Sequence, residues 1–146
     1  MKRRAGRVNF LAVLGILGIL IIGVFFVIGG ESASSVASRF FTALARGDAK
    51  ALANVSYMPG LAPAEIEKKW EYTTQVVAPH YPFRWEVVNE SRADETNAAV
   101  TIKMWKNFGD SGSYDERFGV PMVRQDGKWL VDVRGIPRKM FPGLPR

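Results

Sequence analysis

The chain has 146 residues, no cysteine and a formal net charge of +6, from 20 Lys and Arg against 14 Asp and Glu. Four of the cations lie among the first seven residues, so the rest of the chain is nearly balanced and lacks the basic stripe, interleaved with aromatic side chains, that nucleic-acid-binding proteins present. The composition therefore argues against nucleic acid as a partner, and the lack of cysteine excludes disulfides and lipid attachment at a cysteine.

An apolar segment over residues 8–30 directly follows the basic flank of residues 1–7. Phe10 to Ile28 carries no charged side chain, and a helix over 8–30, at about 1.5 Å per residue, is long enough for a hydrocarbon core of roughly 30 Å. We predict a single transmembrane helix with its basic flank in the cytoplasm, which places the rest of the chain in the periplasm of a bacterium, outside the inner (plasma) membrane. The predicted membrane-anchor residues are Phe10, Leu14, Gly15, Gly18, Ile22, Phe25 and Ile28.

A cleaved signal peptide is the alternative interpretation of the same segment. Signal peptides have an apolar region of about 7–15 residues followed by a small-x-small cleavage site. Ser35-Val36-Ala37 fits such a site. The apolar run is longer than a signal peptide needs, so we favour a retained anchor with the lipid bilayer as its partner.

Three helices are predicted after a short polar exit from this segment. Ser34 or Ser35 is a candidate N-cap for the first of them. Its apolar stripe recurs at helical spacing at Val36, Phe40, Ala43 and Leu44. Gly47 is predicted to end this helix, and Asp48 to cap a second, short helix over residues 49–55.

The third predicted helix follows the break at Met58-Pro59-Gly60 and begins at Pro63, a residue suited to the first helical position. Glu65 and Lys69 form a predicted exposed pair four residues apart, and Pro79 is predicted to stop the helix. Its buried face is predicted to hold Ile66, Trp70, Thr73 and Val77.

After Pro82 the hydrophobic pattern changes from the helical period to strict alternation, which predicts strands. The predicted inward positions of four successive strands are Phe83, Trp85, Val87, Val100, Ile102, Met104, Phe118, Val120, Met122, Trp129, Val131 and Val133. Asp126-Gly127 is predicted as a tight turn, and Pro121 as a bulge or edge position. Helices followed by a four-stranded antiparallel meander predict an α+β domain over residues 31–134, with the helices packed on one face of the sheet.

The run from Val36 to Leu52, with its aromatic pair, Ala-Leu step and Gly-Asp break, resembles the opening of nuclear-transport-factor-2-like (cystatin-like) domains. Asp126 to Asp132 is similar to their terminal strand, and the two matches bracket residues 34–134. The resemblance implies a cone-shaped fold in which helices cover a strongly curved antiparallel sheet, often with a pocket between the layers. Membrane-anchored versions are similar to small bacterial domains of unknown function and to bitopic periplasmic subunits of conjugation and type IV secretion channels.

The resemblance also raises the possibility of an enzyme, because catalytic relatives place an Asp, His or Tyr inside the cone as acid or base. The predicted inward positions carry no side chain that titrates near neutral pH. The sole histidine, His80, is predicted in a loop, where a surface role is expected. The sequence also lacks metal-ligand spacings and phosphate-binding or dinucleotide-binding glycine motifs. We therefore expect a non-catalytic protein without a cofactor or metal.

The last segment, residues 135–146, combines three prolines and three cations with large apolar side chains. Such a composition is not expected to fold alone. We predict candidate partner contacts at Ile136, Met140, Phe141 and Leu144. The alternative is that this segment, here named the tail, packs back along its own domain.

Together these features predict a single-pass, membrane-anchored, non-catalytic binding or assembly module that serves as an accessory or structural subunit of a larger membrane complex. Its predicted partners are the lipid bilayer and other membrane-protein subunits. Two alternatives stay open. One is a subunit of a secretion or conjugation channel, and the other is a carrier of a small apolar ligand, or a pocket enzyme, with the same fold.

Overall fold

The computed structural model describes residues 30–106 and 115–146. Its internal contacts divide the chain into two units, Met1–Gly30 and Glu31–Arg146, and all the described helices and strands belong to the second unit. The predicted transmembrane helix, with its seven anchor residues, lies outside the described residues. Within residues 30–106 and 115–146, no helix combines the length and the apolar character needed to cross a membrane.

The first described helix, α2 (Ala33–Arg46), begins earlier than predicted. Its N-cap is Ser32, whose Oγ accepts a hydrogen bond from the Ser35 N–H at 3.1 Å. The predicted caps, Ser34 and Ser35, are therefore wrong. Ser34 lies in the first turn of the helix. Its N–H and its hydroxyl both donate to Glu90 Oε2 on the sheet, each at 2.8 Å.

The junction between α2 and α3 (Ala49–Val55) has the predicted chemistry. Gly47 ends α2 with φ 69°, a left-handed conformation that a glycine adopts without strain. The Asp48 carboxylate accepts a hydrogen bond from the Ala51 N–H at 2.9 Å and so caps α3. Both assignments are confirmed.

Helix α4 (Pro63–Tyr72) begins at Pro63 as predicted. The winding continues as a π-helix, η1 (Thr73–Val77), and then as a 3-10 turn, η2 (Ala78–His80). It ends at His80, one residue after Pro79, so the predicted stop is confirmed to within one residue.

The predicted buried face of this region is confirmed by Ile66, Trp70, Thr73 and Val77, the last of them half-buried. Glu65, predicted to pair with Lys69, has a different contact: its Oε2 accepts a hydrogen bond from the Ala62 N–H at 2.7 Å. The carboxylate thus satisfies a backbone donor at the start of α4.

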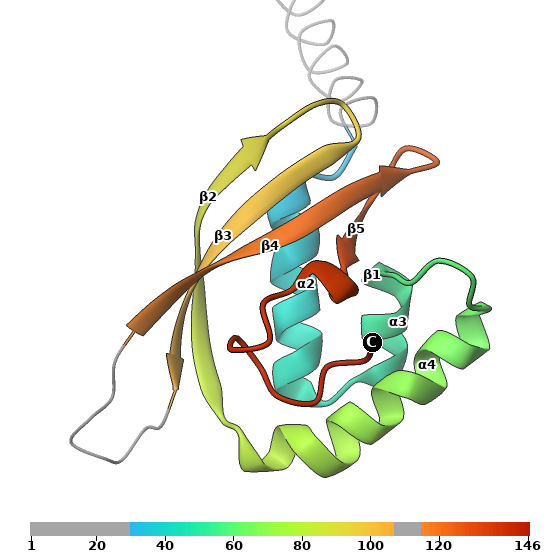
Figure 1. Ribbon diagram of the computed structural model, residues 1–146, viewed down its shortest axis with the longest axis vertical. Helices are drawn as coiled ribbons and strands as arrows, with labels where there is room; N and C mark the ends of the chain where they lie inside the picture. The colour runs from blue at the N-terminus through green and yellow to red at the C-terminus, as the bar shows by residue number, and fades with distance from the viewer. Residues whose placement is uncertain (1–29, 107–114) are drawn as a thin grey trace, which may run out of the picture. The chain divides into compact units, whose positions relative to one another are not determined.

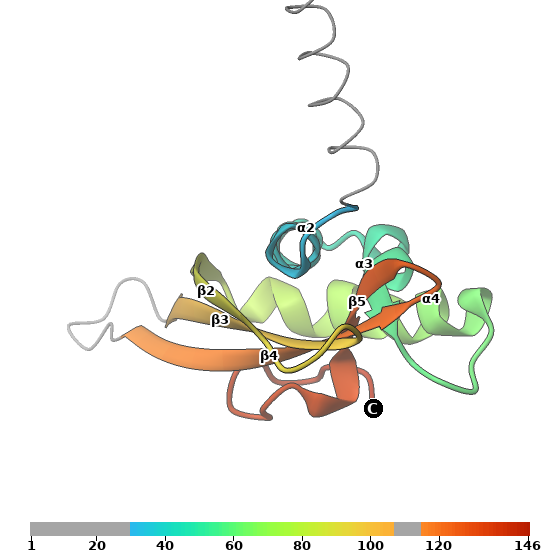
Figure 2. The same cartoon turned by 90° about the horizontal axis from the view of Figure 1, so that it is seen from above.

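Five strands form one sheet in the order β1-β5-β4-β3-β2. The four predicted strands are β2 (Phe83–Arg92), β3 (Asn97–Lys106), β4 (Asp115–Gln125) and β5 (Lys128–Asp132), and each pairs antiparallel with the next. The fifth strand, β1 (Ser56–Tyr57), pairs parallel with β5; at two residues it is too short to leave a periodic signal in the sequence. Figure 1 shows the strong twist of this sheet, and Figure 2 shows α2 and α3 on one side of it.

The strand register agrees with the predicted alternation. Val100 is paired with Val120, and Ile102 with Phe118. All the predicted inward positions of β3, β4 and β5 are buried, while those of β2 are half-buried against the core. Val133 is buried too, although it opens a 3-10 turn, η3 (Val133–Gly135), instead of ending the strand.

Two turn-related predictions have different outcomes. Pro121 lies inside β4 in regular register with β3, without the predicted bulge but at the predicted edge position, because no described strand pairs with its other side. The sheet tolerates this proline because β4 pairs with β5 only from Met122 onward, so the missing N–H leaves no bond to β5 unmade. The turn at Asp126 and Gly127 is confirmed, with positive φ values of 49° and 76°.

A bulge in β2 connects the sheet to the first turn of α2. The register shifts just after Val87, and Glu90 pairs with the inward-facing Val100 as a result. Glu90 thereby receives the two hydrogen bonds from Ser34. Arg92 Nε donates to the other carboxylate oxygen of Glu90 at 3.0 Å. The alternation seen up to Val87 could not reveal this change of face.

Aromatic contacts join the helices to the sheet. The Phe40 ring lies against Phe41 and Trp70, at centroid distances of 5.3 and 5.5 Å. Phe41 in turn lies 5.6 Å from Trp85 of β2. The Trp70 indole N–H donates to Ser56 Oγ at 3.0 Å, so the one polar atom of this large side chain is satisfied inside the core.

The first prediction concerns Trp129, which is 3% exposed on β5. Trp129→Ala should lower the free energy of unfolding by about 3–5 kcal/mol, the usual range for removing a large buried aromatic side chain. Chemical denaturation measures the loss. Val88→Ala, at a position that is 42% exposed, is the control and should change stability by no more than about 0.5 kcal/mol. A loss below about 1 kcal/mol for Trp129→Ala would contradict its place on the inner face.

The second prediction concerns the pH dependence of Glu90. Partial burial raises the pKa of this carboxyl, but the hydrogen bonds from Ser34 and the ion pair with Arg92 lower it by more, so it lies below its ordinary 4.5. Such a group stabilises the fold above its unfolded pKa, and the contribution is lost as the pH falls through the folded value. Glu90→Gln should therefore reduce stability at neutral pH, with a difference from the parent that shrinks below about pH 4.5.

Unfolding curves recorded across this pH range test the point. Glu71→Gln, at an exposed position on α4, is the matched control. A Glu90→Gln difference that stays constant with pH would mean that the carboxylate charge plays no part.

Candidate functional site

The tail folds back along its own domain, as Figure 1 shows. Ile136, Met140, Phe141 and Leu144 are only 1%, 0%, 2% and 6% exposed. The prediction that these side chains are exposed for a partner is wrong, and the alternative of a tail packed on its own domain is confirmed. The physical reason is that each large apolar side chain taken out of water contributes about 1.5–3 kcal/mol.

The tail meets the end of the helical layer at Gly143. The Thr73 hydroxyl of η1 donates a hydrogen bond to the Gly143 carbonyl at 2.5 Å. Gly143 has φ 72°, and a Cβ atom at this position would lie 2.7 Å from a methyl carbon of Val77. Both the backbone conformation and the close approach require glycine here.

Cationic side chains satisfy carbonyl groups of the tail that have no strand partner. The Arg146 guanidinium donates to the carbonyls of Arg134 and Ile136, at 2.7 and 3.0 Å. Lys106 Nζ donates to the Lys139 carbonyl at 2.5 Å. These bonds fix the path of a proline-rich segment that lies outside the sheet.

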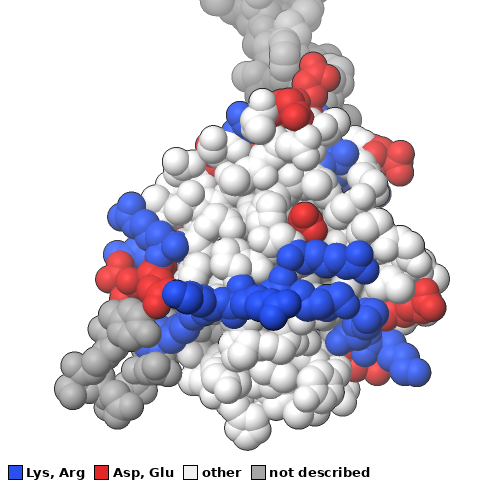
Figure 3. Space-filling view, viewed as in Figure 1, with Lys and Arg blue, Asp and Glu red and all other residues white. Residues whose placement is uncertain are grey.

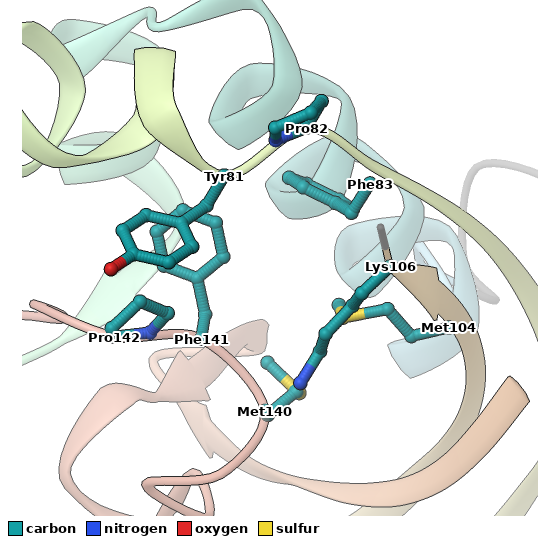
Figure 4. Close-up of a pocket in the computed structure, with 8 residues that line it drawn as sticks. All are labelled: Tyr81, Pro82, Phe83, Met104, Lys106, Met140, Phe141 and Pro142. Atoms are coloured by element: carbon teal, nitrogen blue, oxygen red, sulfur yellow. The ribbon is translucent and has the colours of Figure 1, made fainter. Parts of the chain in front are cut away.

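A small apolar cleft lies where the tail meets the sheet, and Figure 4 shows its walls. It is lined by Tyr81, Pro82, Phe83, Met104, Lys106, Met140, Phe141 and Pro142. The Phe141 ring packs against Phe83 and Tyr81, at centroid distances of 5.6 and 6.2 Å. The whole space between the walls, open solvent included, is about 270 Å³. The centre of a water molecule can occupy only about 30 Å³ of it, so the cleft has room for roughly two waters.

Lys106 is the one charged residue in the walls of this cleft. Burial lowers the pKa of Lys106, and the attraction of Glu116 opposes that shift. Its Nζ also lies 4.9 Å from the centroid of the Phe118 ring. The sequence analysis missed this residue, although extending the inward alternation of β3 by one step beyond Met104 leads directly to it.

The cleft can hold a small apolar group beside a cation. Apart from Lys106, the Tyr81 hydroxyl is the one charged or hydroxyl-bearing side-chain group in its walls. His80 is exposed in η2, so the structure places it in a helical turn at the surface and not in the predicted loop. Among the described residues, no group of three or more His, Cys, Asp or Glu side chains could hold a metal ion.

Comparison with known proteins identifies the architecture. No protein-family model matches the chain, and no curated protein matches it significantly. Among solved structures it is similar to a candidate calcium/calmodulin-dependent protein kinase type II association domain from Thiobacillus denitrificans, at 13% identity and a TM-score of 0.50, covering 70% of this chain and 90% of that one.

Two further solved structures are similar at lower scores. One is a domain of unknown function with a cystatin-like fold from Nostoc punctiforme, with 14% identity, a TM-score of 0.49, and 66% of this chain and 68% of that chain covered. The other is a ketosteroid isomerase-like protein from Erwinia carotovora, with 13% identity, a TM-score of 0.46, and coverage of 67% and 86%. At such identities the likeness concerns the fold alone, an α+β domain with helices packed on a mostly antiparallel sheet.

The third prediction tests the tail as part of the core. Phe141→Ala should lower the free energy of unfolding by about 3–5 kcal/mol, because it deletes a fully packed aromatic ring. Lys139→Gln, two residues away and exposed, is the control and should be nearly neutral. The measurement is again chemical denaturation. A protein truncated after Arg134 that unfolds at the same denaturant concentration as the full chain would contradict the role of the tail.

Proposed function

We propose that the protein is a non-catalytic binding module that serves as an accessory subunit of a larger membrane complex. Residues 8–30 hold it at the inner membrane, with Glu31–Arg146 outside the cytoplasm. The observation that supports a non-catalytic role is the position of Met140 and Phe141. These buried side chains of the tail occupy the space beside Met104 and Phe83, where the sheet would otherwise offer an opening. Pockets that enclose small-molecule ligands have volumes of about 300–1,000 Å³, whereas this cleft has room for roughly two waters. A wider depression of about 430 Å³ lies beside β1, between Ser56, Ile66 and Gln125, but it is open to solvent and does not enclose a ligand.

The anchored part of the proposal is supported by the composition of the first thirty residues. A basic flank followed by an uncharged segment is typical of a transmembrane helix with its N-terminus in the cytoplasm. Folding of the outer domain does not require disulfides, because its core is continuous from α2 through the sheet to the tail. This suits a chain without cysteine in an oxidising compartment.

A carrier of a small apolar ligand is the second candidate, and the cleft at Lys106 is the observation that favours it. A ligand larger than a few atoms would need Met140 and Phe141 to move outward. That movement would expose two fully packed side chains at a cost of several kcal/mol. We therefore rank this function below assembly.

The fourth prediction concerns topology and assembly. A reporter that is active only outside the cytoplasm should be active when fused after Arg146, and the protein should stay with membranes after a carbonate wash. In mild detergent, the native size should exceed that of the 16.2 kDa monomer with its detergent. His80→Ala should change none of these results, because no proton-transfer step is proposed for it.

Two outcomes would contradict parts of the proposal separately. A shortened, soluble form that begins near Ser35 to Ala37 would identify a cleaved signal peptide. A membrane-bound protein that sediments only as a monomer would leave the anchor intact and exclude stable assembly.

A further inference from the structure

Two segments meet at one end of the domain, and neither contains an acidic residue. They are residues 72–82, from the end of α4 through η2, and residues 133–146. They touch where the Thr73 hydroxyl donates to the Gly143 carbonyl and where the rings of Tyr81 and Phe141 lie 6.2 Å apart. We name the surface formed by these two segments the basic end; Glu71 and Asp132 directly precede the two segments in the chain, so acidic residues border it.

The cations of the basic end are exposed and available. Arg138 and Lys139 of the tail and Arg134 of η3, just before it, occupy exposed positions. The ion pairs found in the described part of the chain involve Arg39, Arg92 and Lys103, and so none of these three. Figure 3 shows a row of Lys and Arg side chains across the face on which the tail lies, with uncharged surface below it.

The same end of the domain carries exposed apolar side chains. Tyr72, Val76 and Tyr81 are 63%, 49% and 49% exposed, and all three come from the acid-free segment 72–82. Tyrosine has an apolar ring and a polar hydroxyl, which suits it to the headgroup level of a bilayer. Cations next to such side chains are the usual composition of surfaces that bind anionic lipid.

The backbone that carries these groups is fixed, and the surface is not hollowed for a peptide. Burial of Met140 and Phe141 holds the tail from the inside, and the Arg146 guanidinium holds it from the outside. The adjacent cleft has room for roughly two waters, which is too little for the side chains of a bound helix or strand. A lipid surface requires no complementary groove.

We propose that the basic end binds the anionic headgroups of a lipid bilayer, with Arg134, Arg138 and Lys139 at the phosphates and Tyr72, Val76 and Tyr81 at the headgroup level. This contact is separate from the anchor proposed for residues 8–30 and does not depend on it. Because it is electrostatic, it weakens with rising salt concentration.

The fifth prediction tests this contact with the full chain. The protein is reconstituted into nanodiscs of phosphatidylcholine and mixed with vesicles of phosphatidylcholine, either alone or with phosphatidylglycerol, and flotation measures the bound fraction. Binding is expected only to the vesicles with phosphatidylglycerol and only at low salt. Lys139→Gln should raise the lipid concentration for half-binding about fivefold, equivalent to about 1 kcal/mol for one cation near an anionic surface. Lys128→Gln, the same change of charge at the exposed start of β5, should leave it unchanged.

Equal binding to both kinds of vesicle, or an equal loss with Lys139→Gln and Lys128→Gln, would overturn the proposal. Capture of a polyglutamate peptide without binding to phosphatidylglycerol vesicles would assign the surface to an acidic protein and would overturn it as well. A chain that leaves the neutral nanodiscs would refute the anchor instead. The comparison of the two lysine variants, made with the free protein, would still decide the lipid contact.

Discussion

Burial of the tail determines both the interior and the surface of this domain. The chain has no cysteine, so packing and hydrogen bonds, without a disulfide, keep its last residues in place. Met140 and Phe141 complete the core beside Met104 and leave only a narrow cleft at Lys106. The same stretch of backbone presents Arg138 and Lys139 to solvent. An apolar inner side and a basic outer side therefore depend on one packing interaction.

A buried serine joins two helices to the edge of the sheet. Ser56 opens β1 and is 5% exposed. Its hydroxyl donates to the Leu52 carbonyl at 2.6 Å and accepts from the Trp70 indole at 3.0 Å. One hydroxyl thus links α3, α4 and the edge of the sheet. Because β1 has only two residues, few ladder hydrogen bonds stabilise it. The bond to Trp70 and the pairing of Ser56 with Val131 hold it in place.

The sequence predicts those parts of the fold that have a period or a local cap. The stripes of α2 and the alternation in β3 to β5 repeat often enough to be recognised, and Gly47 and Asp48 act through bonds within a few residues. The missed features depend on distant contacts. Ser34 meets Glu90 across the domain, β1 exists only against β5, and the tail is buried because the sheet offers an apolar surface. Lys106 of the candidate site could have been predicted by extending the alternation of β3 beyond Met104. The closure of its cleft by Phe141 could not, because it depends on how the tail packs.

The contact between Ser34 and Glu90 has a mechanical consequence. The chain enters the domain at Glu31, and within the first turn of α2 it is bonded to β2. A tension applied at residue 30 is therefore transmitted to the sheet within a few residues, before it can unwind the helix from its end. β2 and β3 are paired along most of their length, so many hydrogen bonds share the load. The first turn, which frays most easily in an ordinary helix, is in α2 the turn that is hydrogen-bonded to the sheet.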